Sequence, residues 1–201
     1  MNIEIPENLK TKFDDCILVG YCGSIAHNTV VEDGDYSTDD IDLMGVKVAP
    51  ISCYFGIDND EGSQTQTGQF DITIFEIRKF VRLLIKSNPS VIGFLWSNES
   101  MYIKKDSLGE ILINHRNIFS TKQMYYTFLG YAISQMKKMS GGSYMGYMGT
   151  KRKQLFDKFG YDPKNAAHMI RLLRMGNEFL RTGELVTYRP DREELIEIKC
   201  G

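Results

Sequence analysis

The sequence has few cysteines, no long apolar run and no internal repeat. Its four cysteines, Cys16, Cys22, Cys53 and Cys200, include no C-x-x-C pair, which argues against a zinc knuckle or a disulfide framework. No apolar stretch approaches the roughly 18 residues that a membrane-spanning helix needs. The N-terminal MNIEIPENLK also lacks the basic-then-apolar order of a secretion signal. We therefore expect a cytoplasmic protein with reduced thiols and no membrane span.

Charge is unevenly distributed along the 201 residues, although the net charge is only −2. Residues 1–100 contain 7 Lys and Arg against 16 Asp and Glu, whereas residues 101–201 contain 17 against 10. An acidic half that attracts cations, joined to a basic half that attracts phosphates, is typical of enzymes that act on nucleotides or nucleic acids. Ordinary variation of the surface is the alternative interpretation of the same counts.

The hydrophobic pattern changes from alternation in the first half of the chain to helical spacing in the second. Alternating apolar residues predict strands at 40–48 and 69–75, and a short apolar run predicts a buried strand at 17–21. A helix is predicted at 76–86, and from about residue 106 the pattern is mostly helical, including 164–181. We therefore predict an α+β fold. An α+β lobe of residues 1–105, with a small mixed sheet and helices, would precede an α-helical lobe of residues 106–201.

Two aspartates, Asp40 and Asp42, lie two residues apart at the start of the second predicted strand. Residues at this spacing on a strand point to the same face, so the two carboxylates can converge while Ile41 faces the core. Paired carboxylates suit Mg²⁺, which normally shares the phosphates of its substrate with one or two protein carboxylates. Because a D-x-D pair alone is more often an exposed strand end, the remaining motifs decide between the two interpretations.

Other motifs accompany the aspartate pair. Gly23-Ser24 follows the first predicted strand, and Asp71 lies on a later one. Together, Gly23-Ser24, Asp40-x-Asp42 and Asp71 resemble the pattern of the DNA polymerase beta-like nucleotidyltransferase superfamily. Segments at 39–46, 71–80, 88–90 and 160–174 resemble, as a set, the predicted nucleotidyltransferases associated with RNA ligase and polynucleotide kinase. This resemblance covers most of the chain.

The resemblance implies that Asp40, Asp42 and Asp71 are catalytic and hold two Mg²⁺ ions, with Mn²⁺ as an alternative. One ion would lower the pKa of an attacking hydroxyl, and the other would stabilise the departing pyrophosphate. Gly23 would let the backbone approach the triphosphate of the nucleotide, and Ser24 would donate its hydroxyl and amide to the phosphates. The alternative for Ser24 is that it caps its helix.

Two basic clusters in the second half are candidate phosphate-binding surfaces. Lys164, His168 and Arg171 are spaced i, i+4 and i+7, so they share one face of the predicted helix 164–181, which we predict to bind the nucleotide. The cluster Lys151-Arg152-Lys153 is predicted to contact a nucleic acid through its phosphates. A solvated helix face and a plain basic helix start are the respective alternatives.

The sequence thus predicts a Mg²⁺-dependent nucleotidyltransferase that transfers a nucleoside monophosphate from a nucleoside triphosphate to a hydroxyl acceptor and releases pyrophosphate. An RNA end is the favoured acceptor, because of the resemblance and of the basic second half. One alternative is a protein acceptor, as in the small antitoxin nucleotidyltransferases that attach AMP to a toxin tyrosine. Another is a module that binds a nucleotide or RNA without catalysis.

Overall fold

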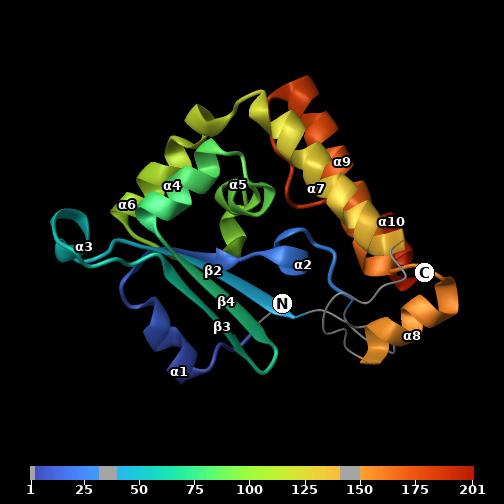
Figure 1. Cartoon of the computed structure of the whole chain (residues 1–201), viewed down its shortest axis with the longest axis horizontal. Coiled ribbons are helices and arrows are strands. Elements are labelled where there is room, and N and C mark those ends of the chain that lie inside the picture. Colours follow the sequence, from blue (N-terminus) through green and yellow to red (C-terminus); the bar gives the residue numbers. More distant parts are fainter. Residues whose placement is uncertain (1–2, 32–39, 141–149) are drawn as a thin grey trace.

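The computed structural model describes residues 3–31, 40–140 and 150–201 of the chain. Its centre is a five-stranded mixed sheet in the order β3-β4-β2-β1-β5, in which β2 and β4 are parallel and the other neighbours are antiparallel (Figure 1). β4 alternates buried and partly exposed residues along its whole length, as its sequence predicts. The strands are β1 (Cys16–Tyr21), β2 (Ile41–Lys47), β3 (Gly62–Thr67), β4 (Phe70–Glu76) and β5 (Tyr102–Lys105).

Short helices precede the first strand, separate most of the strands in the chain and follow the last one. The helix that follows β4 directly buries Phe80 and Leu84, and its first turn is capped by the side chain of Glu76. The side chains of Asn88 and Asp106 cap the next two helices in the same way. These helices are α1 (Glu7–Lys10), α2 (Gly23–Ala26), α3 (Ser52–Phe55), α4 (Ile77–Ile85), α5 (Pro89–Leu95) and α6 (Ser107–Asn114), with 3₁₀ helices at Thr11–Phe13, Glu99–Met101 and Arg116–Phe119.

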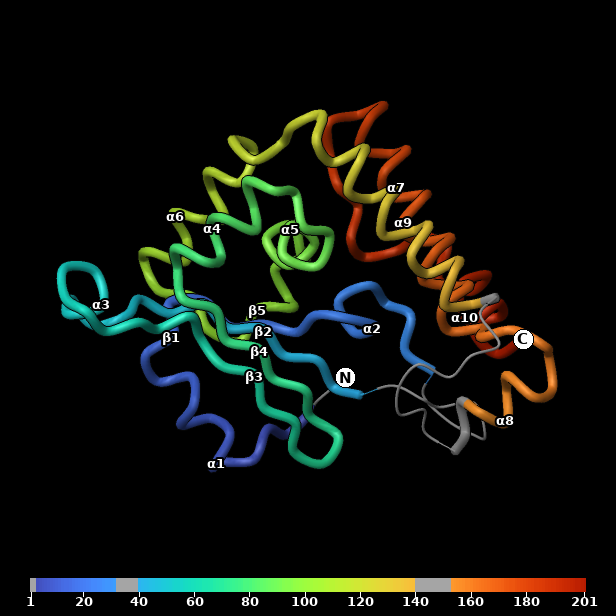
Figure 2. Tube along the Cα trace, in the orientation of Figure 1, coloured from blue at the N-terminus to red at the C-terminus, as the bar shows by residue number. Residues whose placement is uncertain are grey.

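The C-terminal part of the chain is helical. Its helices are α7 (Gln123–Ser140), α8 (Thr150–Phe159), α9 (Pro163–Thr182) and α10 (Arg192–Cys200). α7 and α9 pack along each other, and α10 packs against α9 (Figure 2). Asp162 caps the start of α9 before Pro163, and Gly183, with a φ of 77°, ends it in the left-handed conformation. α5 lies between α4 and the α7–α9 pair, and it contacts both α4 and α7.

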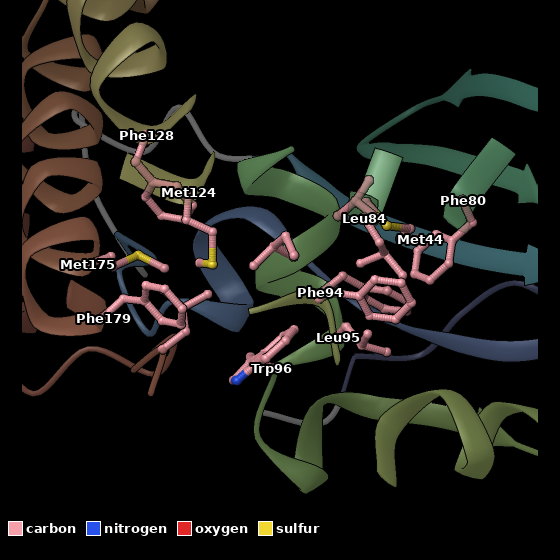
Figure 3. Close-up of a cluster of buried hydrophobic side chains, with 14 of the residues drawn as sticks. Met44, Phe80, Leu84, Phe94, Leu95, Trp96, Met124, Phe128, Met175 and Phe179 are labelled. Carbon is pink, nitrogen blue, oxygen red and sulfur yellow. The ribbon is translucent and has the colours of Figure 1, made fainter. Parts of the chain in front are cut away.

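One hydrophobic core runs from the sheet to the C-terminal helices. Figure 3 shows this cluster, in which Met44 of β2 and Phe94 of α5 belong to the same buried set as Phe128 of α7 and Met175 of α9. A second cluster lies around the N-terminal helix α1 and the other face of the sheet, and includes Leu43. The first core therefore crosses residue 105, and the division into lobes 1–105 and 106–201 stays a prediction.

The predicted fold class is confirmed, because a mixed sheet with helices precedes a helical C-terminal region. Several elements were not predicted, among them α1, β3, β5 and α10. β3 has the polar sequence GSQTQT without apolar alternation, and its antiparallel pairing with β4 stabilises it as an edge strand. None of the helices within the described residues has the length and hydropathy that a membrane span requires.

Candidate active site

Two aspartates on adjacent parallel strands lie side by side. Asp42 of β2 and Asp71 of β4 are direct partners in the register of the pair, so their side chains emerge on the same face at neighbouring positions. Both line a cavity of about 390 Å³, here named the larger cavity. Burial raises the pKa of the Cys22 thiol, and the negative charges of Asp42 and Asp71 raise it further, because the thiol is close to both.

Asp40 has a different position from the other two predicted carboxylates. It precedes β2, is exposed, and does not line the larger cavity. In the ranges 3–31, 40–140 and 150–201, no group of three or more His, Cys, Asp or Glu side chains is arranged to hold a metal ion. Two oxygen-donating carboxylates in one cavity nevertheless fit Mg²⁺, which usually takes one or two protein carboxylates and completes its shell with water and substrate phosphates. The metal-binding role of the three aspartates stays a prediction.

Gly23 packs directly against the carboxylate of Asp42. Its φ is 58°, and a Cβ atom at this position would overlap Oδ2 of Asp42. Only glycine combines this backbone conformation with this close approach. The backbone N–H of Cys22 also donates to the carbonyl oxygen of Asp42 at 2.9 Å. The turn at the start of α2 is thereby held against the start of β2.

A second cavity, of about 180 Å³, adjoins the larger one and is named the smaller cavity. Five residues line both and mark their junction: Gly23, His27, Asp42, His168 and Arg171. Ser24 lines the smaller cavity only. Lys164, His168 and Arg171, which the sequence places on one helix face, all reach the smaller cavity from α9. Helix α9 and the Gly23-Ser24 turn therefore meet around one space, although some 140 residues separate them in the chain.

Arg171 is a cation without a carboxylate partner among the residues that the structure describes. Its guanidinium makes one hydrogen bond there, to the sulfur of Met175 at 3.4 Å. Burial, followed by the charge of Arg189, lowers the pKa of Arg171 to about 9. Arg171 is partly buried, and a desolvated cation is costly unless it is paired, so the geometry favours an anion in the cavities as its partner.

The two histidines at the junction are neutral. Burial, followed by the charges of Arg171, Lys138 and Lys164, lowers the pKa of His168 to about 3. Burial also lowers the pKa of His27 well below its usual value. The ring Nδ1 of His27 lies 2.9 Å from the carbonyl oxygen of Thr187, so Nδ1 carries the proton and donates. Neither ring adds a positive charge to the site at neutral pH.

Several polar residues that line the cavities were missed by the sequence reasoning as site residues, among them His27, Lys199, Asn88 and Tyr131. Lys199 of α10 is buried, lines the smaller cavity, and donates from Nζ to the carbonyl oxygen of Thr29 at 3.0 Å. Asn88 and Tyr131 line the larger cavity. The pair Asn88-Pro89 does carry a signal, but one for a helix start. Tyr131 and Lys199 have no local sequence signal, since only the packing of α7 and α10 brings them to the site.

The predicted nucleic-acid cluster lies at the start of α8. The side chain of Lys153 is exposed and does not line either cavity. The side chains of Lys151 and Arg152 lie outside the described part of the structure. The role of this cluster therefore stays a prediction.

Comparison with known proteins agrees with the motifs. A search of the curated proteins finds no match. A family model described as the RNA repair pathway DNA polymerase beta family matches residues 23–198. The matched segment begins at Gly23 and includes Asp42, Asp71 and the whole of α9. The predicted resemblance is thus confirmed over most of the chain, which belongs to the RNA repair pathway DNA polymerase beta family of nucleotidyltransferases.

Proposed function

We propose that this protein is a Mg²⁺-dependent nucleotidyltransferase that transfers a nucleoside monophosphate from a nucleoside triphosphate to a hydroxyl acceptor, with release of pyrophosphate. The acceptor proposed is an RNA end. The observation that carries the proposal is the register of Asp42 opposite Asp71 inside the larger cavity, with Gly23 packed against the carboxylate of Asp42. The family, a polymerase beta family of RNA repair, supports the same chemistry.

The two cavities suggest how the nucleotide lies. The smaller cavity gathers the hydroxyl of Ser24 and the cationic groups of Lys164, Arg171 and Lys199, which suit the β- and γ-phosphates. The larger cavity is lined mainly by apolar side chains and suits the nucleoside. The α-phosphate would then lie at the junction, beside Asp42 and Arg171.

This placement separates the attacking and leaving groups. Asp71 lines the larger cavity but not the smaller one. A hydroxyl that enters beside Asp71 would attack phosphorus from the side opposite the pyrophosphate, as in-line displacement requires. The new bond would join the acceptor oxygen to the α-phosphorus, the bond to the bridging oxygen would break with its electron pair leaving on pyrophosphate, and Asp71 would accept the hydroxyl proton.

The residues of the chain have separate parts in this step. Asp42 and Asp71 would hold the metal ions, with Asp40 as a third ligand. When bound, the ions supply a lowered hydroxyl pKa and neutralise charge on the phosphates. Arg171 would pair with non-bridging phosphate oxygens, and neutral His168 would contribute a hydrogen bond without further charge.

The acceptor site is proposed to involve the second half of the chain. Its excess of Lys and Arg supports contact with RNA phosphates, and the proposed lobe of residues 106–201 would present Lys151, Arg152 and Lys153 to them. The proposed lobe of residues 1–105 would supply the carboxylates. The family description supports RNA over a protein acceptor.

The test uses each nucleoside triphosphate labelled at the α-phosphate, with Mg²⁺ and total RNA. We expect label on RNA with the wild type, loss of labelling after EDTA, and recovery with Mg²⁺ or Mn²⁺. Asp42→Asn and Asp71→Asn should each lower the rate by more than about 100-fold, because loss of even a secondary metal contact costs about 10- to 100-fold. Asp58→Asn, at an exposed aspartate outside both cavities, is the matched control.

The outcomes separate the alternatives. Label on a protein would replace the RNA acceptor by a protein one. Absence of label under every condition, with nucleotide still bound, would leave the binding module. Equal activity of the wild type and the two aspartate variants would overturn the proposed site.

A further inference from the structure

The first turn of α5 fixes the orientation of an amide in the larger cavity. Oδ1 of Asn88 accepts hydrogen bonds from the backbone N–H groups of Ser90, at 3.1 Å, and Val91, at 3.3 Å. The oxygen of this amide is therefore committed to the helix cap, and its nitrogen must point the other way. Nδ2 of Asn88 donates to the hydroxyl oxygen of Tyr131 at 2.8 Å.

This hydrogen bond determines whether the hydroxyl of Tyr131 can act as a donor or as an acceptor towards a ligand. A phenolic hydroxyl is one donor and also an acceptor, and here the oxygen already accepts from Asn88. The bond from Asn88 is the single hydrogen bond of the Tyr131 hydroxyl within the described residues. Tyr131 is 38% exposed and lines the larger cavity. Its hydroxyl proton is therefore available as a donor to a bound molecule.

The surroundings of Tyr131 suit a flat aromatic ligand. Apolar side chains of β4, α4, α5 and α9 line the same cavity, among them Phe75, Leu83, Pro89 and Leu172. A planar base fits against such side chains and turns a polar edge towards a donor. The cavity thus combines apolar contact area with one oriented donor.

We propose that Tyr131, oriented by Asn88, reads the base of the nucleoside triphosphate. A base that presents a hydrogen-bond acceptor to the hydroxyl of Tyr131 is selected. A base that presents a donor there is rejected, because the hydroxyl proton would lose its partner in a partly desolvated site. This inference rests on the proposed function, since it assigns the nucleoside to the larger cavity.

Two substitutions test the hydrogen bond between Asn88 and Tyr131 while an oxygen still caps α5. Tyr131→Phe deletes the donor and keeps the ring. Asn88→Asp keeps an oxygen for the cap, since aspartate is an equally good N-cap residue, but replaces the amide donor by an acceptor. The hydroxyl of Tyr131 would then donate to the carboxylate and turn away from the ligand. Tyr126→Phe on the same helix is the matched control, because Tyr126 is 66% exposed and lies outside the cavity.

The readouts are calorimetric binding of adenosine, guanosine, cytidine and uridine, and the ratio of kcat/KM among the four nucleoside triphosphates. We expect the wild type to prefer one or two bases. Tyr131→Phe and Asn88→Asp should each reduce that preference by about five- to tenfold, the effect of one hydrogen bond, with the melting temperature unchanged. Tyr126→Phe should retain it.

The outcomes distinguish this inference from the proposed function. If nucleotide transfer occurs but both variants keep the wild-type ratios, the base-reading role is wrong and the proposed function stands. If no transfer is found while nucleosides bind with a preference that depends on Tyr131, the base-reading role holds and the proposed function fails. Equal binding of all four nucleosides by the wild type would also overturn the inference.

Discussion

Helix α9 contributes positive charge to two regions that use it differently. On the cavity side, Arg171 faces both cavities and has no ion pair among the described residues. The other region is an ion-pair cluster between α9 and the C-terminal segment, residues 184–201. There the guanidinium groups are matched by carboxylates. The cluster consists of Arg174, Glu178, Arg189, Asp191 and Glu194.

The difference separates the charges that stabilise the fold from Arg171, which is proposed to bind a ligand. The ion-pair cluster holds the C-terminal segment, and that segment contacts the turn after α2. The backbone N–H of Arg189 donates to the carbonyl oxygen of His27 at 3.2 Å, and the ring of His27 donates to Thr187. A structural arginine meets its partner within the chain, whereas Arg171 has room for a partner from outside. Four substitutions or conditions test this distinction.

The largest effect is expected from Arg189→Met. The side chain of Arg189 is 1% exposed, and it donates to both carboxylate oxygens of Glu178 and to Asp191. Removing one partner of a buried pair costs about 3–5 kcal/mol, and we expect about 3 kcal/mol because both carboxylates reach solvent. Urea unfolding measures this loss, with Arg82→Met, at an exposed arginine of α4, as the control. A loss no larger than that of the control would show that the cluster does not stabilise the fold.

Arg171→Met should lower activity but should not lower stability. We expect kcat/KM for nucleotide transfer to fall about 10- to 100-fold, because a hydrogen bond to a charged group contributes about 1.5–3 kcal/mol. The free energy of unfolding should rise by about 1 kcal/mol, because an apolar side chain replaces a desolvated cation that lacks a partner. Arg181→Met, at an exposed position on the same helix, should change neither quantity. If Arg171→Met is less stable than the wild type, Arg171 stabilises the fold, as the arginines of the ion-pair cluster do.

The sequence could predict the groups in this comparison but not how each is used. The spacing of Lys164, His168 and Arg171 predicts their common face, and all three do reach one cavity. That Arg171 lacks an ion pair while Arg174 has two depends on where the C-terminal segment packs. No local pattern encodes that packing, because α10 is a short charged helix that contacts α9 only in the folded chain.

The same limit applies to the sheet and to the carboxylates. Alternation predicts β4, but β3 lacks an apolar pattern and forms because β4 provides its hydrogen-bond partners. The motifs predict that Asp42 and Asp71 act together, whereas their direct register follows from the parallel pairing of β2 with β4. Asp40 is exposed before β2, so its role as a metal ligand stays a prediction.

The third effect is a difference between the two regions in how their contribution to stability depends on pH. The pKa of His168, lowered to about 3 by burial and then by nearby cations, lies below the value of about 6.5 in an unfolded chain. Between these values the unfolded chain binds a proton that the folded chain does not. Stability is therefore lost as the pH falls below about 6.5, by up to about 1.4 kcal/mol per pH unit for each such histidine. Burial also lowers the pKa of His27, so this residue too makes the folded chain less stable as the pH falls.

The ion-pair cluster should not respond in this range. Burial alone would raise the pKa of Asp191, but hydrogen bonds from Arg189 and Arg174 lower it to about 2. Its contribution is present above the unfolded value of about 3.9 and is lost only as the pH falls towards about 2. Urea unfolding at pH 7, 6 and 5 should show a slope that His168→Gln reduces and that the exposed-site control His115→Gln leaves unchanged. An unchanged slope in His168→Gln would show that His168 is not held neutral.

The smallest effect is expected from Arg174→Gln, and it tests whether burial or the number of partners decides the strength of an ion pair. Arg174 contacts Asp191 at 2.6 Å and Glu194 at 2.8 Å, as many carboxylates as Arg189, but its side chain is 33% exposed. Exposed ion pairs contribute about 0.2–1 kcal/mol and weaken with salt, so we expect about 0.5 kcal/mol at low ionic strength and less at 1 M salt. Asp191 also keeps its bond from Arg189 in this variant. If Arg174→Gln costs as much as Arg189→Met, the contrast between buried and exposed arginines fails, and the cluster acts as one coupled network. A double-mutant cycle between the two positions would measure that coupling directly.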